Sequence, residues 1–344
     1  MTVGLLLLVA FLAYANGSND NSKGIATLVG YGAASERVAL IYATLATLVG
    51  AMVSFYFSHG LLKKFSTGLF TDGTLLEPRF FVAVLIGSIA WVAFATHTGL
   101  PVSTTHAILG SLLGAGLVTF SHDKILWAKL ESGFLLPLIL SPLLAMAIVY
   151  LLAWPIAAAV RKPRIETEAL VEVVQRSTSV AVMAAEQTRA ITSRSTNTVH
   201  WFSAGLISFA RGWNDTPKIA ALSLLALPPG RTRIVFLIVA IATAAGAIIS
   251  GRKVLNTLSK KLTPLPLLES LTASLSTAVL VCLASWQGLP VSTTHVSTGA
   301  IIGGGLKNDP NAVQWKKVME IVLSWIITLP AAALIAALAK WLLH

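Results

Sequence analysis

The chain has 344 residues, of which 55% are hydrophobic and only 11% are charged, whereas soluble domains carry about 25% charged residues. So much apolar surface could not be hidden in a core while so few charges covered the outside, which excludes an ordinary soluble enzyme and indicates that lipid is the natural solvent. The formal net charge of +11 is expected to serve membrane topology and lipid headgroups rather than nucleic acid. The single cysteine, Cys282, leaves no intrachain disulfide and no cysteine-rich metal site.

Long uncharged windows predict membrane-spanning helices, because a helix needs about 20 apolar residues to cross about 30 Å of hydrocarbon. Windows of this kind cover residues 38–57, 133–160, 234–251 and 321–339. The apolar stretches 2–31 and 199–227 are each interrupted by polar residues near the centre. A signal peptide over residues 1–16 is disfavoured, since no Lys or Arg precedes the apolar run.

Two longer windows predict helical hairpins. Residues 80–121 and 270–306 contain no Asp, Glu, Lys or Arg, and each is long enough for two helices. The tripeptide Gly-Leu-Pro interrupts the first window at 99–101 and the second at 288–290. Because proline cannot continue a helix without losing a hydrogen bond, we expect a helix, a break and a second helix in each window.

The sequence is a duplication. Gly-Leu-Pro-Val-Ser-Thr-Thr-His at 99–106 recurs letter for letter at 288–295, 189 positions later. Upstream, Ala-Asn-Gly-Ser-Asn-Asp-Asn-Ser-Lys at 15–23 aligns with Ala-Arg-Gly-Trp-Asn-Asp-Thr-Pro-Lys at 210–218, at an offset of 195. We therefore expect a first transmembrane repeat over 1–160, a hydrophilic linker over 161–198 and a second repeat over 199–344.

The number of spans sets the relative orientation of the repeats. Each repeat contains about five apolar spans, and an odd number forces the second repeat to enter the membrane in the opposite orientation. Inverted repeats are typical of secondary transporters, which hold substrate near the midplane where broken helices meet. The predicted fold is an all-α, multi-pass integral protein of the plasma membrane, with an inverted-topology repeat of about five spans each and with broken helices and helical hairpins at the midplane. The basic residues at 161–164 favour a cytoplasmic linker.

Ionisable residues inside the predicted spans gather in the repeated upstream motif. They are Asp20, Lys23, Arg211, Asp215 and Lys218, while Lys340 lies at the C-terminal end of a span and can snorkel. A charge in mid-span costs a few kcal/mol or more, so it indicates a functional site by default. The alternative is that each aspartate and the lysine three residues later form a structural ion pair on one helix face.

The Ser-Thr-Thr sequence after each break predicts an oxyanion site. Ser and Thr hydroxyls cap helix N-termini, and a half-helix that begins there points its free N–H groups and positive dipole end at the break, where phosphate or sulfate could bind. The alternative is plain capping of an ordinary helix. His106 and His295 close the two motifs, and we expect them to be structural histidines that donate to a neighbouring carbonyl rather than titrating groups.

These motifs together resemble a known family. Asn-Asp at 19–20 and at 214–215, in helices expected to be broken, is followed in each repeat about 80 residues later by Pro-Val-Ser-Thr-Thr-His. This doubled combination resembles the paired signatures of the inorganic phosphate transporter (Pit) family, which includes sodium-phosphate symporters. The resemblance implies a homodimeric carrier without enzymatic activity or cofactor, which moves inorganic phosphate together with a cation, Na⁺ or H⁺, by alternating access.

The resemblance also implies the site residues. The coupling cation would bind at Asp20, Asp215, Asn19 and Asn214. Phosphate would bind at Ser103, Thr104, Thr105, Ser292, Thr293 and Thr294, together with Asn19, Asn214, Arg211, Lys23 and Lys218.

At one position the chain departs from the family signature in both repeats. The signature carries a second asparagine three residues after the aspartate, where this chain has Lys23 and Lys218. A lysine there can reach the carboxylate on the same helix face, and lysine releases its proton readily when desolvated. We therefore hypothesise that at least one ammonium replaces a sodium ion, so that coupling is to protons or to fewer sodium ions. The alternative is that both lysines attract phosphate while sodium binds elsewhere.

Other functions remain open at this point. A sulfate or other oxyanion permease of the same family would use the same motifs, and an anion channel would share the helix-end chemistry. A membrane phosphatase is a weaker alternative. Ser193 and Arg194 with His200 match the spacing of one phosphatase motif, but the companion Lys-x6-Arg-Pro element is absent.

Overall fold

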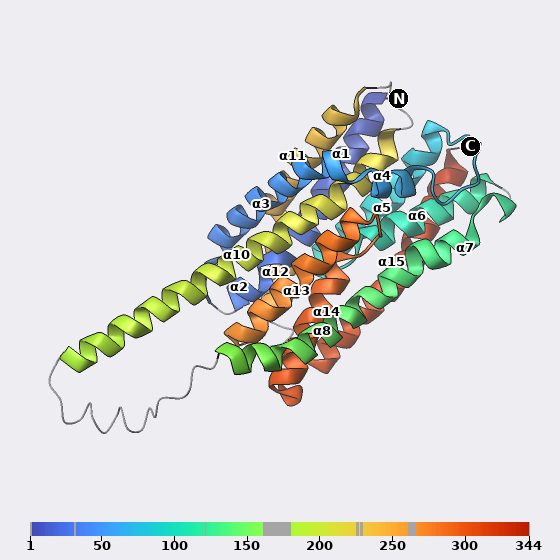
Figure 1. The fold of residues 1–344 in the computed structure, drawn as a ribbon. Helices are drawn as coiled ribbons and strands as arrows, with labels where there is room; N and C mark the ends of the chain where they lie inside the picture. Colours follow the sequence, from blue (N-terminus) through green and yellow to red (C-terminus); the bar gives the residue numbers. More distant parts are fainter. Residues whose placement is uncertain are drawn as a thin grey trace.

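The computed structural model describes residues 2–30, 32–120, 122–160, 180–224, 227, 230–260 and 266–343. These residues form helices and connecting turns, with one isolated bridge between Phe70 and Ile125 as the only β-pairing among them. Within the described ranges, seven helices are long and apolar enough to cross a membrane. The expected all-α integral membrane fold is therefore confirmed (Figure 1).

The long helices follow one another in the same order in the two repeats, with more short helical segments in the first. The first consists of α1 (Thr2–Asp20), η1 (Asn21–Ile25), α2 (Ala26–Gly30), α3 (Glu36–Phe57), α4 (His59–Ser66), α5 (Pro78–Thr98), α6 (Thr104–Thr119), η2 (His122–Lys124), α7 (Trp127–Leu130), η3 (Glu131–Leu135) and α8 (Leu136–Val160). The second consists of α10 (Val180–Leu224), α11 (Thr232–Ser250), α12 (Arg252–Lys260), α13 (Leu267–Trp286), α14 (Thr293–Asn308), η4 (Pro310–Ala312) and α15 (Trp315–Leu342). Residues 180–198 of the predicted linker are thus the first part of α10, while 161–179, including the basic stretch 161–164, lie outside the described residues.

The two predicted helical hairpins are present. α5 packs against α6, and α13 packs against α14. Gly99 and Gly288, which follow the first helix of each hairpin, have φ angles of 77° and 67°. A residue with a side chain rarely adopts this left-handed conformation, so glycine is the residue that allows the chain to leave the helix and turn into the proline.

The upstream motifs differ between the repeats. α1 ends at Asp20, and the chain continues through η1 into α2, so the expected break in the first repeat is confirmed. The expected break at Asn214 is wrong, because α10 runs through it without interruption and contains Pro217 inside the helix. A proline removes one helical hydrogen bond, but α10 is packed against both α3 and α13, and neighbouring helices make such a loss tolerable within a membrane.

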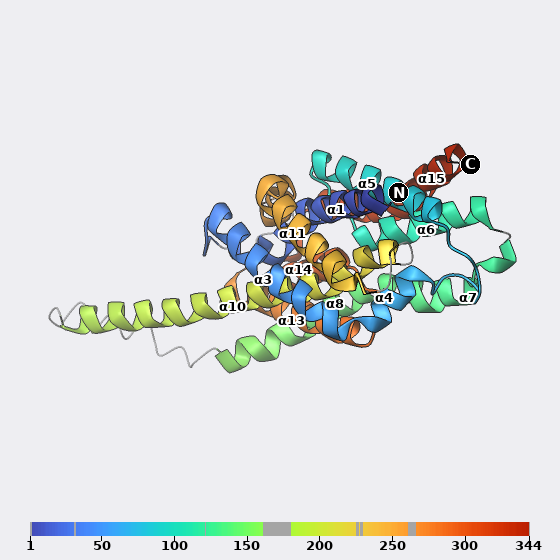
Figure 2. The ribbon, with the colours of Figure 1, turned by 90° about the horizontal axis from the view of Figure 1, so that it is seen from above.

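The two ends of each repeat lie at opposite ends of the molecule. Figure 1 shows both termini at one end of the molecule, whereas the C-terminal end of α8 and the first residues of α10 lie at the other end. Figure 2 shows from above that the first part of α10 extends beyond the other helices. This arrangement is consistent with the inverted topology expected from an odd number of spans per repeat.

Helices of one repeat pack mainly against helices of the other. α1 packs against α11 and α3 against α10, while α6 packs against α15 and α14 against α8. Equivalent glycines make the first two contacts close: a Cβ at Gly17 would lie 1.9 Å from the carbonyl oxygen of Thr243, and one at Gly212 would lie 2.0 Å from that of Thr47. Small residues allow membrane helices to approach closely and stabilise their association by dispersion contacts.

The two half-helices lie at the centre of this packing. α6 and α14 have 16 residues each, fewer than the roughly 20 needed to cross the bilayer. They are buried from Thr104 to Gly116 and from Thr293 to Gly305. Their N-termini therefore end inside the protein, away from lipid.

Candidate functional site

Most of the buried charge gathers in one place. Six charged side chains are buried among the residues that the structure describes, and one of them, Lys340, lies near the end of α15. The other five are Asp20, Lys23, Arg211, Asp215 and Lys218, from the end of α1, from η1 and from the middle of α10. The sequence-predicted ionisable residues are thus brought together beside the N-termini of α6 and α14.

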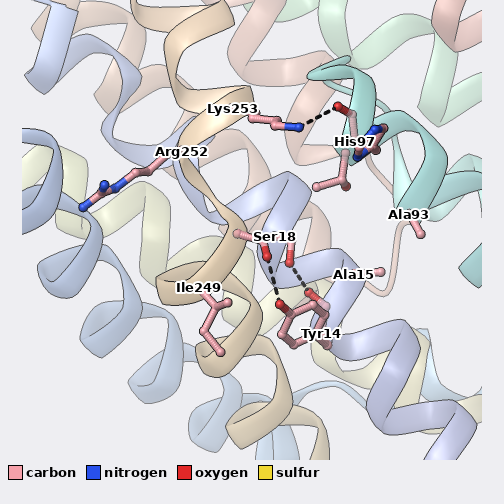
Figure 3. Close-up of a pocket in the computed structure, with 10 residues that line it drawn as sticks. Tyr14, Ala15, Ser18, Ala93, His97, Ile249, Arg252 and Lys253 are labelled. Atoms are coloured by element: carbon pink, nitrogen blue, oxygen red, sulfur yellow. Dashed lines mark hydrogen bonds between the residues drawn. The ribbon is translucent and has the colours of Figure 1, made fainter.

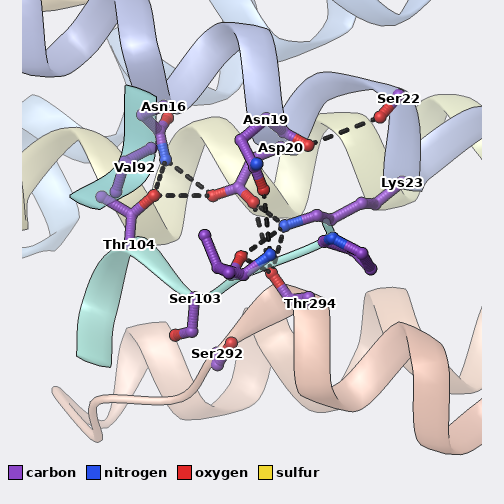
Figure 4. Close-up of polar contacts among 12 residues, drawn as sticks. Asn16, Asn19, Asp20, Ser22, Lys23, Val92, Ser103, Thr104, Ser292 and Thr294 are labelled. Atoms are coloured by element: carbon purple, nitrogen blue, oxygen red, sulfur yellow. Dashed lines mark hydrogen bonds and ion pairs between the residues drawn. The ribbon is translucent and has the colours of Figure 1, made fainter. Parts of the chain in front are cut away.

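The ammonium group of Lys23 has three oxygen partners. It forms an ion pair with Asp20, donates to the carbonyl oxygen of Val102 at 2.7 Å, and donates to the hydroxyl of Thr294 (Figure 4). Val102 lies in the break of the first hairpin, whereas Thr294 lies in the first turn of α14. The group therefore joins its own repeat to the other one.

Lys218 makes the equivalent contacts from the second repeat. Its Nζ lies 3.4 Å from Asp215 Oδ1, 2.8 Å from the carbonyl oxygen of Val291 and 2.8 Å from the hydroxyl of Thr105. Val291 and Thr105 are the counterparts of Val102 and Thr294 at the offset of 189. Each ammonium thus has a carboxylate, an unwound carbonyl and a hydroxyl from the opposite repeat as partners, and unwound carbonyls are ligands for coupling ions in transporters of this architecture.

The two motif asparagines hold the hairpin breaks. Asn19 Nδ2 donates to the carbonyl oxygen of Leu100 at 2.9 Å, and its Oδ1 accepts a hydrogen bond from the Val102 N–H at 3.2 Å. Asn214 Nδ2 donates to the carbonyl oxygen of Val291 at 3.1 Å. These contacts satisfy backbone groups that proline and the turn leave without helical partners.

The two motif serines act as helix caps. Ser103 Oγ accepts a hydrogen bond from the N–H of His106 at 3.2 Å, and Ser292 Oγ accepts one from His295 at 3.3 Å. This is the usual N-cap geometry, in which the hydroxyl satisfies one free N–H of the first turn. Both serines therefore cap their half-helices, and the binding of phosphate by their hydroxyls stays a prediction.

The motif threonines face the charged groups more directly. Thr104 Oγ1 donates to Asp20 Oδ2 at 3.1 Å, and Thr293 is buried at the equivalent position of α14. Thr105 and Thr294 accept from the two lysines, as described above. The hydroxyls of α6 and α14 thus belong to the same polar cluster as the aspartates.

The two motif histidines lie against each other. The ring centroids of His106 and His295 are 4.4 Å apart, and His295 also stacks on Trp325 at 3.9 Å. His106 Nδ1 and His295 Nε2 have no hydrogen-bond partner in the described part of the chain. His295 also forms a hydrogen bond with the backbone of Leu138, as expected for a structural histidine, and ring stacking packs the pair.

Several polar residues of the site were missed by the sequence analysis. Asn16 Nδ2 donates to Asp20 Oδ2 at 2.7 Å. Asn21 Nδ2 donates to Thr44 Oγ1 at 3.0 Å, and Asn21 Oδ1 accepts from Thr47 Oγ1 at 2.8 Å. The available signal was weak: Asn16 and Asn21 lie inside the repeated motif, and the two threonines are polar residues within an otherwise apolar span.

A cavity of about 400 Å³ adjoins the cluster on one side. It lies between α1, α5, α11 and α12, and Tyr14, Ser18, Thr96 and Ser250 are among its lining residues (Figure 3). Tyr14 Oη lies 2.8 Å from Ser250 Oγ. Because Thr96 Oγ1 accepts a hydrogen bond from Asn19 at 3.1 Å, the wall of the cavity contacts the site directly.

In the second repeat, an aromatic side chain stands at the position equivalent to a lining residue of this cavity. Trp213 occupies the position equivalent to Ser18, at the offset of 195. Its ring lies 6.1 Å from that of Phe57 and 5.8 Å from that of Phe209, centroid to centroid. The cluster therefore has an open cavity beside the first motif and packed aromatic rings beside the second.

Comparison with known proteins identifies the family. The profile of the Phosphate transporter family matches residues 16–336. A protein of Rhizobium meliloti named as a low-affinity inorganic phosphate transporter is 29% identical, over 98% of this chain and 95% of its own length. A protein of Mycobacterium tuberculosis with the same name is 29% identical, over 99% of this chain and 78% of its own length.

A solved structure described as the sodium-dependent phosphate transporter has a similar fold. The TM-score is 0.83 at 24% sequence identity, and the match covers 99% of this chain and 98% of the other. The family and the relatives are transporters, so the phosphatase alternative is wrong. The chain therefore belongs to the phosphate transporter family: it is a multi-pass integral membrane transporter of phosphate, not an enzyme.

Proposed function

We propose that the protein is a secondary active transporter that moves inorganic phosphate together with a cation, Na⁺ or H⁺, by alternating access. One observation carries the proposal: the ammonium groups of Lys23 and Lys218 are each bound by residues of both repeats. Any rigid-body movement of one repeat against the other must change these contacts. The binding of ions and substrate at the cluster is thereby linked to the relative position of the repeats, as symport requires.

Phosphate would bind where positive charge and free N–H groups meet. The N-termini of α6 and α14 begin at the cluster, and the threonines of both first turns face it. Helix N-termini favour oxyanions through their N–H groups and dipole. The proposed phosphate ligands are therefore the threonine hydroxyls and the cationic side chains, with the serines acting on the helix ends.

Alternating access is supported by the difference between the two sides of the cluster. A cavity reaches Thr96 and Ser18 on one side, whereas Trp213 packs against other aromatic rings at the equivalent place. A transporter that exposes its site to one side at a time requires such an asymmetry. Access to the cluster from the side of the second motif would require the Trp213 ring to leave its contacts with the neighbouring aromatic rings.

The geometry around the lysines favours coupling to fewer sodium ions. Each ammonium is bound by the kinds of oxygen atoms that would otherwise hold a coupling cation. We propose that Asp20, Asp215, Asn19 and Asn214 form the cation site and that at least one lysine replaces a sodium ion. The structural neighbour is sodium-dependent by its description, which supports cation coupling as such. The alternative, in which the lysines attract phosphate while sodium binds elsewhere, is decided by the sodium dependence of uptake.

We also propose that the protein assembles as a homodimer, as the family resemblance implies. The molecular mass of the purified protein in detergent, measured by light scattering with the detergent contribution subtracted, tests this directly. A mass near 36.3 kDa, that of one chain, would contradict it.

Substrate identity is tested by competition in proteoliposomes that contain the purified protein. We expect saturable uptake of radiolabelled phosphate, strong competition by arsenate, which is nearly isosteric, and weak competition by sulfate. Stronger competition by sulfate than by arsenate would instead indicate a sulfate permease.

A further inference from the structure

The two motifs differ at the residue four positions before the aspartate. The first repeat has Asn16 there and the second has Arg211, at the offset of 195. Asn16 Nδ2 donates to Asp20 Oδ2 at 2.7 Å and to Thr104 Oγ1 at 3.0 Å. The first carboxylate therefore has partners for both oxygens, because Lys23 binds the other one (Figure 4).

The equivalent groups of the second repeat lack such partners. Arg211 is 1% exposed, and its Nε and Nη1 have no hydrogen-bond partner among the described residues. Asp215 Oδ2 is likewise buried without a partner there. Two buried, charged groups in one motif thus have free hydrogen-bonding positions, while the corresponding groups of the other motif are satisfied.

A buried guanidinium without partners is costly, because a charge removed from water requires pairing and hydrogen bonds. The guanidinium plane presents donors in a fork that matches the oxygens of phosphate. Arg211 lies four residues before Asp215 on α10, and therefore on the same face of that helix. The free donors thus belong to the same motif as the unpartnered carboxylate oxygen.

The balance of charge also points to an anion. The cluster holds three cationic side chains, those of Lys23, Arg211 and Lys218, and two carboxylates. Each lysine already has its own aspartate as an ion-pair partner. Arg211 is the cation in excess, and a bound anion would compensate its charge.

We infer that the site is functionally asymmetric: phosphate binds on the second-repeat side, on the guanidinium of Arg211, while the first-repeat side is closed by its own hydrogen bonds. This inference rests on the proposed transport of phosphate. It adds that only one of the two related motifs supplies the principal phosphate ligand. The first motif then serves as a structural and ion-binding counterpart.

The test is direct binding of inorganic phosphate to the purified protein in nanodiscs, by isothermal titration and by the phosphate-induced rise in melting temperature. Arg211→Asn places the residue of the first repeat in the second one and should weaken phosphate binding by at least about tenfold, the effect of losing a hydrogen bond to a charged group. Arg211→Lys keeps the charge but loses the forked arrangement of donors. The phosphate affinity of this variant should therefore lie between that of the wild type and that of Arg211→Asn. Arg79→Asn removes an exposed arginine far from the motif in sequence and should leave binding unchanged.

A structural role for Arg211 would give a different result. If the guanidinium mainly stabilised the fold, Arg211→Asn would lower the melting temperature measured without phosphate. We expect that temperature to be kept or raised, because an unpartnered buried charge is removed. Phosphate binding by Arg211→Asn within twofold of the wild type would overturn the inference, and if that variant fails to fold, unchanged affinity in Arg211→Lys would do so. Absence of phosphate binding by the wild type would instead contradict the proposed function itself.

Discussion

Lys218 Nζ donates a hydrogen bond to Thr105 Oγ1 at 2.8 Å, across the contact between the two repeats. Lys23 donates to Thr294 in the same way from the first repeat. The two lysines lie at equivalent positions, and so do the two threonines. The two lysines therefore join the repeats at the cluster, each binding a hydroxyl of the opposite repeat.

The aspartates should be essential for driven transport. Asp20→Asn and Asp215→Asn keep the shape of the side chain but remove the charge that would hold a cation beside an anionic substrate, so each should abolish uphill uptake. Each substitution leaves a buried lysine without its carboxylate, which costs about 3–5 kcal/mol. Asp20→Asn should destabilise the protein more than Asp215→Asn, because Asp20 also accepts hydrogen bonds from Asn16 and Thr104.

The readouts for the aspartate variants are gradient-driven uptake in proteoliposomes and the elution profile in detergent. Retained uphill uptake by both variants would return the aspartates to a purely structural role as ion-pair partners.

The lysines should determine how strongly phosphate uptake depends on sodium. Lys23→Asn and Lys218→Asn restore the asparagine of the family signature and remove an ammonium from a set of oxygen ligands, so uptake by the variants should depend more steeply on sodium than uptake by the wild type. The measurement is the initial rate of uptake against sodium concentration at fixed pH. A steep dependence that is the same in the wild type and both variants, without any response to a proton gradient, would disprove the replacement of sodium by lysine.

The contact between α1 and α11 should depend on Gly17. A Cβ at this position would lie 1.9 Å from the carbonyl oxygen of Thr243, and such overpacking costs about 1–3 kcal/mol. Gly17→Ala should lower the melting temperature in detergent. Gly4→Ala is the matched control on the same helix, because a Cβ at Gly4 meets nothing within 4 Å; an equal effect of both substitutions would contradict the close approach.

The cavity should make one of two equivalent serines reactive. Ser250 lines it, whereas Ser54, its counterpart on α3 at an offset of 196, is 1% exposed. In a Cys282→Ala background, which removes the single native cysteine, Ser250→Cys should react with a water-soluble thiol reagent faster than Ser54→Cys. Saturating concentrations of phosphate and the coupling ion should reduce this difference in labelling rate, because they populate the conformation that is open to the opposite side of the membrane. Equal labelling of both cysteines under all conditions would contradict alternating access.

The hairpins and the location of the site could be predicted from the sequence, because each depends on local chemistry. Proline at 101 and 290 ends a helix wherever it lies, and an aspartate and a lysine three residues apart share a helix face in any fold. The continuity of α10 could not be predicted in this way. Packing by α3 and α13 keeps Pro217 within a helix, and the sequence does not state which helices become neighbours.

The contacts between the repeats could not be predicted from the sequence either. Lys23 and Thr294 are separated by 271 positions, and their meeting depends on how two inverted repeats interlock. The unequal roles of Asn16 and Arg211 are visible in the alignment of the motifs. Only the hydrogen bonds show that the first is satisfied and that two nitrogens of the second are not.

Cation-coupled transport is tested most directly by the accumulation of radiolabelled phosphate in proteoliposomes under an imposed sodium or proton gradient. We expect phosphate inside to rise above the external concentration while the gradient lasts, and Asp215→Asn to abolish this accumulation. Phosphate that only equilibrates across the membrane, whichever gradient is imposed, would contradict cation-coupled transport and would indicate an anion channel instead.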